Sequence, residues 1–403
     1  MMDNGITVLR SPWTTATDVM SAVTRAPRSA SRQSKPVKSK ASKLPIRSRA
    51  APMAPPEPAV GSWRSLWLPA MEPLRIGVLG AARISDTAIV GPARDTGHRL
   101  VAVAARDRGR AEDFATASNV ERVLDSYQDV IDDPEVEAIY NPLPNGLHGP
   151  WNLRAIAAGK HVLSEKPSAS NAAEARAVRD AVAASNVKFM EAFHYRYHPV
   201  IARMLEIAGS GELGDLQDID VNMSFPLADP NDPRWNMELA GGAVMDVGCY
   251  AIHGLRTLGA VGGGEPSVVS ATAVEREDIP GMDATVEADL VYPSGLSAHF
   301  TTSFVVPEMN FSMRITGSAG EAFAHNFCVS SIDDRIDITV DGQSRTEEMG
   351  KRPSYTYQLE AFADHVRNDA PIHSDADDAL VQAEFIDAVY AAAGLPLRPT
   401  STI

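Results

Sequence analysis

Cysteine is scarce in this sequence, with only Cys249 and Cys328 among 403 residues. Two thiols are too few for a disulfide scaffold or for a cysteine-rich structural zinc site. Cys249 lies in an apolar run with helical character, where a buried thiol is the ordinary interpretation. The cysteine content therefore gives no reason to expect an oxidising compartment.

Long apolar runs and positive charge are also lacking. No run reaches the roughly 18 apolar residues of a membrane span, so we expect none. The formal net charge is -15, which disfavours a nucleic acid partner because phosphate binding needs a basic face. With 44% hydrophobic and 22% charged residues, the composition is typical of a soluble protein of two domains. We expect a cytoplasmic protein with a small-molecule partner.

The charge is divided unevenly along the chain. Residues 1–70 carry eleven Lys or Arg and three acids, net +8, which leaves net -23 for the remainder. Residues 24–60 have too few apolar side chains to offset the entropy of ordering, so we predict a disordered basic leader. It is a targeting peptide, a basic tail, or a stretch that precedes a true start at Met71. We favour Met71, because residues 71–77 lead directly into the first predicted strand.

Apolar runs typical of buried strands alternate with helical segments in the first half of the globular part. The predicted strands are 74–79, 99–105, 136–140, 161–164 and 187–191. The clearest helical segments between them are 150–158 and 171–184. This alternation predicts a doubly wound parallel sheet of the Rossmann type over residues 72–192. Ligands of such sheets bind beyond the carboxyl ends of the strands.

A glycine-containing turn follows the first strand and leads into a helix. The dinucleotide fingerprint is G-x-G-x-x-G/A, and here Ala82 and Ser85 replace its second and third positions. A generic strand–helix turn is the alternative, but the alternation around the turn favours a dinucleotide. The residues expected at the pyrophosphate are Gly80, Ala82, Arg83 and Ile84.

The end of the second strand bears on which dinucleotide binds. An acid at this position suits the ribose 2′-hydroxyl of NAD, whereas an arginine suits the 2′-phosphate of NADP. Arg106 occupies the position and Asp107 follows it. We therefore predict an NADP cofactor, with NAD as the alternative, while a solvated loop charge is the structural alternative for Arg106.

Polar motifs follow the third and fourth strands, where a parallel sheet would bring them to one edge. One is Asn141-Pro142-Leu143-Pro144-Asn145 with His148 shortly after it, and the other is Glu165-Lys166-Pro167. The residues expected on the cofactor side are Asn141, Leu143, Asn145, His148, Glu165 and Lys166. A surface lysine is the alternative for Lys166.

A later helical segment carries a polar stripe in apolar surroundings. Asp246, Tyr250 and His253 are spaced i, i+4 and i+7, so we expect them on one helix face. Such a stripe requires a cavity or buried partners. It lines a site, or it forms a satisfied hydrogen-bond network in the core. For His253, a position that lines the site and a structural role are equally favoured.

Together these motifs resemble the glucose–fructose oxidoreductase, inositol dehydrogenase and rhizopine-catabolism family, Gfo/Idh/MocA. The likeness spans about residues 74 to 396, and within the family it is strongest to the branch of dimeric dihydrodiol dehydrogenases and NADP-dependent D-xylose dehydrogenases. It implies a second α+β domain over 193–396, with a large open, mainly antiparallel sheet that forms a homodimer or a higher homo-oligomer. The strands predicted for that domain are 216–225, 267–273, 285–292, 297–304, 312–316, 321–324 and 332–340.

The C-terminal 355–367 and 377–393 are predicted helices, and the last is expected to pack near the Rossmann domain. The resemblance implies hydride transfer between nicotinamide and a hydroxyl of a sugar or cyclic diol, or reduction of the matching carbonyl. Tyr250 would be the acid/base, and Lys166 would lower its pKa from about 10 toward neutrality. Asp246 would orient the substrate.

Three further interpretations concern the region that connects the domains. The resemblance places Arg196 near the cofactor. Trp235 contacts the substrate or nicotinamide, or it packs in the core. His194 and His198 suggest a metal, but no acid or thiol completes a ligand set, so we expect none. Two other functions stay open, namely a non-catalytic dinucleotide sensor and an aldose-coupled oxidoreductase with tightly bound NADP.

Overall fold

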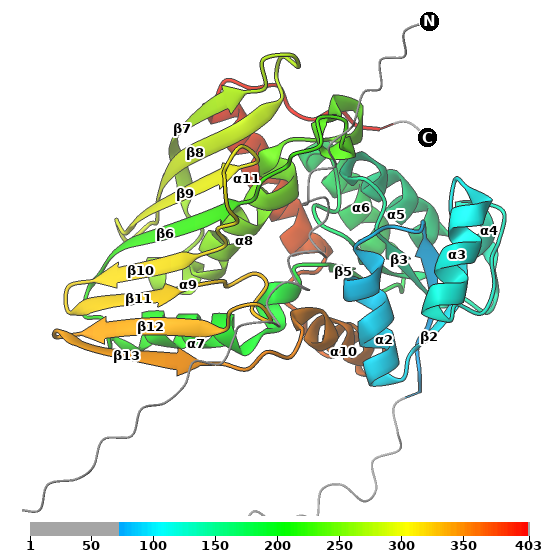
Figure 1. The fold of residues 1–403 in the computed structure, drawn as a ribbon, viewed down its shortest axis with the longest axis horizontal. Coiled ribbons are helices and arrows are strands. Elements are labelled where there is room, and N and C mark those ends of the chain that lie inside the picture. The colour runs from blue at the N-terminus through cyan, green and yellow to red at the C-terminus, as the bar shows by residue number, and fades with distance from the viewer. Residues whose placement is uncertain (1–71, 402–403) are drawn as a thin grey trace, which may run out of the picture. The chain divides into compact units, whose positions relative to one another are not determined.

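Five parallel strands form the first sheet of the computed structural model, which describes residues 72–401. The strands are β1 (Arg75–Leu79), β2 (Arg99–Ala104), β3 (Ala138–Asn141), β4 (His161–Ser164) and β5 (Phe189–Glu191). They lie in the order β2-β1-β3-β4-β5, and Figure 1 labels β2, β3 and β5 in its right half. The order reverses at β1, as in a doubly wound sheet, which confirms the predicted Rossmann fold. The predicted leader lies outside the described residues.

Helices connect these strands, and several begin at a short polar side chain that accepts a main-chain N–H. Asp107, Ser126 and Asn171 cap the helices that follow them. The helices are α2 (Gly91–Thr96), α3 (Arg108–Ser118), α4 (Tyr127–Asp132), α5 (His148–Ala157) and α6 (Ala172–Ala183). The predicted helices at 150–158 and 171–184 correspond to α5 and α6.

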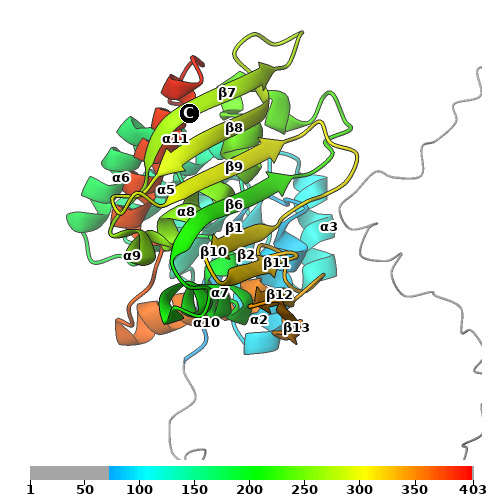
Figure 2. The same ribbon diagram turned by 90° about the vertical axis from the view of Figure 1, so that its left-hand side faces the viewer.

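Eight strands form the second sheet, in the order β13-β12-β11-β10-β6-β9-β8-β7. Only β6 and β9 run parallel to each other; the other neighbours are antiparallel. One face of the sheet is turned to the viewer in Figure 2, with α8 and α11 behind it. The strands are β6 (Leu216–Ser224), β7 (Ser267–Glu275), β8 (Asp283–Val291), β9 (Ser297–Ser303), β10 (Met313–Gly317), β11 (Gly320–Ala324), β12 (Arg335–Val340) and β13 (Gln343–Glu348).

The predicted large, mainly antiparallel sheet is thus confirmed, but its edge strand β13 was not predicted. Its sequence, QSRTEE, contains no apolar residue, and almost all of it is exposed. The strand pairs with a neighbour on one side only, β12, as an edge strand does. A search for alternating apolar residues cannot detect such a strand.

The remaining helices are α7 (Pro199–Ser210), α8 (Cys249–Thr257), α9 (Gly259–Gly262), α10 (Ser354–Asn368) and α11 (Ala376–Ala392). Two of them pack back on the Rossmann part. The apolar side chains of α10, among them Leu359 and Phe362, share a core with Leu74 and Ile76 at β1. The last helix, α11, contacts α6 as well as α8 and β7. The two sheets and their helices therefore belong to one compact unit, residues 72–403.

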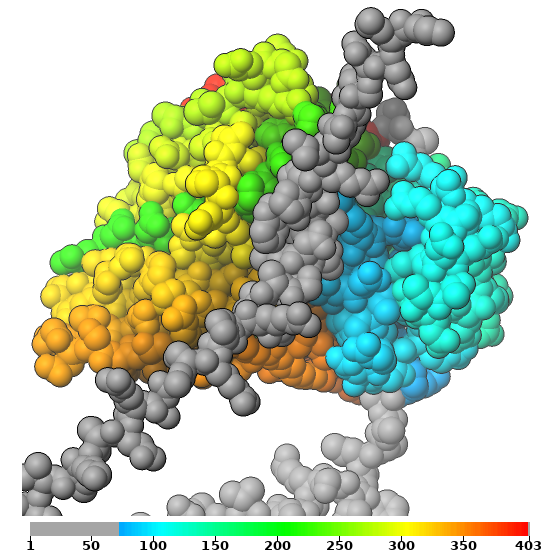
Figure 3. Space-filling view, in the orientation of Figure 1, coloured from blue at the N-terminus to red at the C-terminus, as the bar shows by residue number. Residues whose placement is uncertain are grey.

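No helix between residues 72 and 401 is both long and apolar enough to cross a membrane. In the space-filling view, the blue and cyan Rossmann elements lie on the right, and the green to orange strands of the second sheet lie on the left (Figure 3). The candidate functional residues come from both the Rossmann part and the part built on the second sheet.

Candidate active site

The turn after β1 has the shape that a dinucleotide-binding turn requires. Gly80 has φ +94°, and a Cβ there would lie 3.2 Å from the Leu143 side chain. A side chain is therefore disfavoured at this position both by the backbone conformation and by the lack of space. Within residues 72–401, the main-chain N–H groups of Ala82, Arg83 and Ile84 have no acceptor, which leaves them available to an anion.

The two charged residues of the loop after β2, Arg106 and Asp107, have different contacts. The carboxylate of Asp107 accepts the N–H of Arg110 at 3.0 Å and thereby caps α3. Arg106 is exposed, and Arg110 donates to the main-chain carbonyl of Ala81 at 2.9 Å. The Arg110 guanidinium therefore stands at the glycine turn and Arg106 is exposed to solvent, while the carboxylate of Asp107 is committed to a helix cap. This arrangement suits a phosphate better than a ribose hydroxyl.

Lys166 and Asp246 meet although they are 80 residues apart. Lys166 Nζ donates to the main-chain carbonyl of Asp246 at 2.8 Å and lies 3.4 Å from Asp246 Oδ1. Arg234 Nε donates to Asp246 Oδ2 at 2.6 Å. The side chains of Lys166 and Asp246 are only 12% and 11% exposed. Asp246 is thus a nearly buried carboxylate held between two cations.

The ion pairs continue from Arg234 to the glycine turn. Arg234 Nη1 lies 3.3 Å from Asp232 Oδ1, and Asp232 Oδ2 lies 3.4 Å from Arg83 Nη2. Charges of alternating sign therefore connect Arg83 in the dinucleotide turn with Lys166. Asp232 and Arg234 lie in the loop after β6. This series of ion pairs therefore connects the end of a strand of the second sheet with the glycine turn after β1 and with Lys166 after β4.

The charged states of Lys166 and Asp246 follow from these contacts. Burial lowers the pKa of Lys166, but the acidic groups of Asp246, Cys249 and Glu165 together outweigh burial, and the net pKa is raised. Burial raises the pKa of Asp246, whereas Arg234 and Lys166 lower it more strongly, and the net pKa is below its ordinary value. Lys166 is therefore a cation and Asp246 an anion at neutral pH, so neither is an acid/base that titrates there.

Tyr250 lies beside Lys166, but its pKa moves opposite to our expectation. Lys166 Nζ lies over the ring of Tyr250, 5.0 Å from the ring centroid. The side chain is nearly buried, at 5% exposure, and burial raises the pKa of Tyr250 well above 10. The predicted lowering toward neutrality is wrong for this structure, because Lys166 donates to Asp246 and faces the ring of Tyr250.

The three residues of the predicted polar stripe lie on two successive elements. Asp246 and Tyr250 both contact Lys166, and Tyr250 and His253 both pack against Phe193. Residues Val244–Gly248 form a wide turn, in which the N–H of Cys249 reaches the carbonyl of Val244, and α8 begins only after it. Such a turn contains one residue more than an α-helical turn and is frequent at functional sites. It changes the angular relation between Asp246 and the residues of α8.

His253 is held by several buried contacts. It stacks on Phe193 at a centroid distance of 3.9 Å, and its Nδ1 lies 2.7 Å from the Tyr195 hydroxyl. Its Nε2 lies 3.3 Å from Asp378. It is 2% exposed, and its contacts favour the structural role over a position beside Lys166.

Arg196, expected near the cofactor, lines a pocket of about 120 Å³ together with His253, Arg256 and Asp378. Trp235 is 7% exposed and packs edge-on against Phe304 at 5.1 Å. It therefore occupies the core, the second of our two interpretations. Its neighbour Arg234 reaches Asp246 instead, and sequence reasoning missed it. The signal was available, because a buried aspartate on an apolar helix requires a cationic partner.

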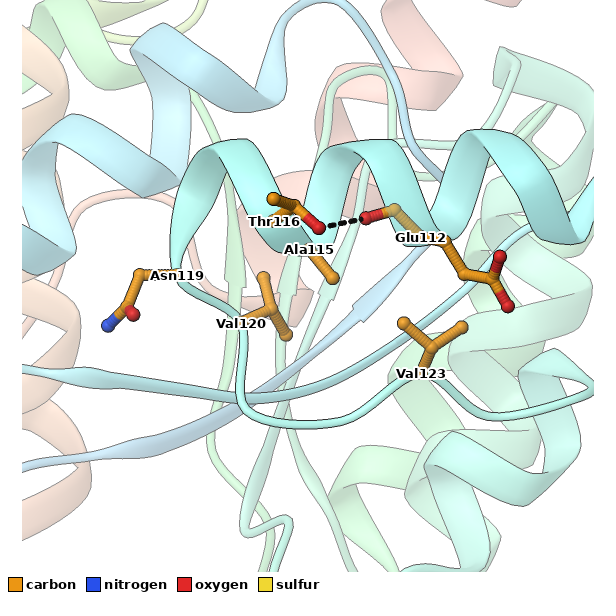
Figure 4. A pocket seen from close by; sticks show the side chains of 6 residues that line it. All are labelled: Glu112, Ala115, Thr116, Asn119, Val120 and Val123. Carbon is orange, nitrogen blue, oxygen red and sulfur yellow. Dashed lines mark hydrogen bonds between the residues drawn. The ribbon is translucent and has the colours of Figure 1, made fainter.

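The other strand-end residues are largely committed to protein contacts. Asn141 donates to the carbonyl of His148 at 3.2 Å, and Asn145 donates to the carbonyl of Ala240 at 3.2 Å. His148 Nδ1 lies 2.7 Å from the carbonyl of Pro167, and Glu165 accepts the Tyr140 hydroxyl at 2.8 Å. They fix the loops that follow β3 and β4, the second of which carries Lys166. A pocket of about 320 Å³ beside α3 contains none of the candidate residues (Figure 4).

Glu191, at the end of β5, was not singled out from the sequence. It is 1% exposed; Oε1 accepts the N–H of Ser168 at 2.6 Å, and Oε2 has no partner among the described residues. Burial raises the pKa of this carboxyl from 4.5 to about 8. The folded protein therefore holds a proton that the unfolded chain releases above about pH 4.5.

The proton on the Glu191 carboxyl makes the free energy of unfolding depend on pH. We expect the free energy of unfolding to fall by up to about 1.4 kcal/mol per pH unit as the pH rises from about 4.5 to about 8. The variant Glu191→Gln should lack this part of the dependence, because its amide does not titrate. Urea unfolding of both proteins between pH 5 and 8 measures the difference; a difference that stays constant over this range would contradict the raised pKa.

Comparison with known proteins agrees with this geometry. The family model described as "Oxidoreductase family, NAD-binding Rossmann fold" matches residues 74–193. The model described as "GFO/IDH/MocA C-terminal domain" matches residues 201–323. Both fall on the elements that carry the site.

Two curated proteins and one solved structure illustrate the similarity. D-xylose 1-dehydrogenase (NADP(+)) 2 of Haloferax volcanii is 35% identical over 323 residues, which cover 79% of this chain and 97% of that protein. Trans-1,2-dihydrobenzene-1,2-diol dehydrogenase of Mus musculus is 34% identical over 62% of this chain and 74% of its own length. KijD10, a 3-ketoreductase from Actinomadura kijaniata, shares the fold with a TM-score of 0.74 at 24% identity, covering 80% of this chain and 98% of that chain.

Proposed function

The chain belongs to the Gfo/Idh/MocA family of oxidoreductases, and from this premise we propose that it is an NADP(H)-dependent dehydrogenase that interconverts a hydroxyl of a sugar or cyclic diol with the matching carbonyl. The observation that carries the proposal is the convergence of Lys166, Asp246 and Tyr250 beside the end of β4. Carbonyl reduction needs a proton donor and a group that stabilises charge on the oxygen, and a tyrosine with a lysine cation over its ring can supply both.

The residues at the sheet edge fit the cofactor. The unoccupied main-chain donors of Ala82, Arg83 and Ile84 suit a pyrophosphate, and Gly80 leaves the close approach that a Cβ would fill. Arg106 and Arg110 suit the 2′-phosphate, since Asp107 is engaged as a helix cap. When bound, NADP(H) supplies or accepts the hydride.

The protein's own contribution is to hold the oxygen of the substrate and to manage its proton. Lys166 is fixed by Asp246, so its remaining N–H groups can orient that oxygen and stabilise negative charge on it. Tyr250, whose pKa burial raises, keeps its proton at neutral pH and is ready to donate it during carbonyl reduction. In the oxidative direction Tyr250 must first lose this proton, so oxidation should be favoured at high pH.

Cofactor choice provides a direct test at Arg106. The variant Arg106→Ala should bind NADP⁺ about 10- to 100-fold more weakly, the value of a charge-assisted hydrogen bond, with little change for NAD⁺. Titration of protein fluorescence with each cofactor measures both dissociation constants. The matched control is Arg108→Ala, whose guanidinium pairs with Glu112 and Asp125. Equal weakening for both cofactors would contradict a 2′-phosphate contact.

Substrate and reaction are tested together by a screen of aldoses, inositols and cyclic diols with NADP⁺, followed by cofactor absorbance. We expect reduction of NADP⁺ with at least one of these classes. Binding of NADP⁺ without turnover of any of them would favour the non-catalytic sensor. An absorbance near 340 nm that persists through dialysis would favour the aldose-coupled oxidoreductase with tightly bound cofactor.

We also propose that the protein forms a homodimer through the outer face of the second sheet. Within the described residues no helix covers this face (Figure 2). It carries half-buried polar side chains such as Asp220 and Thr301. The variant Thr301→Arg should be monomeric in light scattering, whereas Thr116→Arg on exposed α3 should stay dimeric; a dimer that survives Thr301→Arg would place the interface elsewhere.

A further inference from the structure

The C-terminal segment contains a fully buried arginine that no motif of the sequence indicated. Arg398 lies beyond α11, and its side chain has no exposed surface, like that of Asp283, with which it forms an ion pair. Its guanidinium also lies over the ring of Tyr390, 4.3 Å from the centroid. A buried arginine destabilises the fold unless all its N–H donors are satisfied, so the acceptors around Arg398 are part of what holds it in place.

Those contacts hold the turn that precedes Asp246. Arg398 Nε donates to the carbonyl of Gly241 at 2.6 Å, and Nη1 donates to the carbonyl of Gly281 at 3.1 Å. Asp283 Oδ2 accepts the N–H of Val244 at 2.7 Å. The Arg398–Asp283 pair thus fixes Gly241 and Val244, the residues on either side of Gly242–Ala243, where the chain enters the wide turn.

Gly242 is hydrogen-bonded to both members of the Arg234–Asp246 pair, so it connects them to the segment that Arg398 holds. Its N–H donates to the carbonyl of Arg234 at 2.9 Å, and its carbonyl accepts the N–H of Asp246 at 3.1 Å. Its φ is +121°, and a Cβ would overlap the Asp283 carboxylate. The backbone of Gly242 is therefore confined between the buried ion pair and the loop that carries Arg234.

The main chain of Arg398 is bound to the other half of the site. Asn171 donates through its side chain to the carbonyl of Arg398 at 2.8 Å and to the Thr400 hydroxyl at 3.1 Å. Asn171 caps α6, five residues after Lys166. One residue near the C-terminus is therefore bonded both to the segment that follows Lys166 and to the turn that carries Asp246.

We infer that Arg398 is a positioning residue of the active site. It sets the separation of Lys166 from Asp246, because its guanidinium holds the turn before Asp246 and its main-chain carbonyl is bound by Asn171 in the segment that follows Lys166. The inference rests on the proposed function for its effect on turnover, but its effect on the backbone is independent of any reaction. A displacement of about 1 Å in such a site lowers rates by about 100-fold.

The test uses Arg398→Lys in the full chain. A lysine keeps the charge beside Asp283 but lacks the planar fork that also reaches Gly241 and Gly281. We expect kcat about 100-fold lower, a dissociation constant for NADPH within threefold of the wild type, and amide hydrogen exchange at least tenfold faster in residues 240–248 only. The matched control is Arg335→Lys, which replaces an exposed arginine that pairs with Asp333 and should change none of these quantities.

The second variant, Asn171→Ala, releases the main chain of Arg398 without touching the buried pair, and it should lower kcat in the same direction. The inference is overturned if Arg398→Lys keeps both its kcat within twofold and its exchange pattern, or if exchange quickens uniformly through the protein, as for a merely structural role. A wild type without NADP-dependent turnover would refute the proposed function alone; locally faster exchange in Arg398→Lys would then still support the positioning role.

Discussion

Replacement of Tyr250 by phenylalanine is expected to lower kcat about 1,000-fold, within the range that general acid–base catalysis contributes. The change removes only the hydroxyl and keeps the ring that packs edge-on against Phe193 at 5.4 Å. Because the ring and its burial remain, we expect unchanged folding and an unchanged dissociation constant for NADPH. The loss should therefore appear in the chemical step, measured as a larger deuterium isotope effect on hydride transfer.

The raised pKa of Tyr250 also predicts how the rates of reduction and oxidation depend on pH. Because burial raises the pKa of Tyr250 well above 10, the wild type should reduce its carbonyl substrate at a rate independent of pH between about 6 and 9. Its oxidation rate should rise about tenfold per pH unit over the same range, since only the small deprotonated fraction accepts a proton. Tyr250→Phe should lose this rise. A plateau of the oxidation rate below pH 8 would show that the pKa is lowered in the working complex.

The control is Tyr357→Phe on α10, where the ring packs against Arg352 and His198. It should leave kcat within twofold. If Tyr250→Phe also stays within tenfold of the wild type, Tyr250 is not the acid/base, and the proton must come from another group.

Replacement of Lys166 by methionine is expected to lower kcat/KM by about 100- to 1,000-fold, as for removal of one preorganised donor at a developing oxyanion. Methionine fills similar space without the charge. Asp246 keeps its second partner, Arg234, at 2.6 Å, so the variant does not leave an unpaired buried carboxylate. We therefore expect it to fold and to bind NADPH like the wild type.

A matched control is Lys160→Met. Lys160 Nζ also donates to main-chain carbonyls, those of Asp133 and Val136 at 2.9 and 2.6 Å, but it precedes β4, whereas Lys166 follows it. Its replacement should affect stability and leave kcat/KM unchanged. Steady-state kinetics with both variants measures the contrast; equal activities of Lys166→Met and the wild type would remove Lys166 from the mechanism.

The Rossmann sheet was predictable because its signals are local. Each strand is a short apolar run, and the polar motifs at Gly80, Asn141 and Lys166 follow strands directly. Parallel geometry then brings them to one edge without knowledge of side-chain positions. The candidate residues that directly follow these strands could accordingly be singled out from the sequence.

The errors arise where the backbone departs from regular geometry. The wide turn at Val244–Gly248 adds a residue between Asp246 and the residues of α8, and no spacing rule for an α-helix anticipates it. In the loop after β6, the choice between Arg234 and Trp235 depends on which side chain points inward. Arg398 lies 232 residues after Lys166 along the chain, so their connection depends on tertiary structure alone.

The packing of α10 on the Rossmann sheet has a consequence for biosynthesis. Leu359 and Phe362 cover apolar side chains around β1, among them Leu74 and Ile76. On the ribosome these strands emerge nearly 300 residues before the helix that covers them. The nascent nucleotide-binding half therefore presents an uncovered apolar surface until residues 354–368 have left the ribosome.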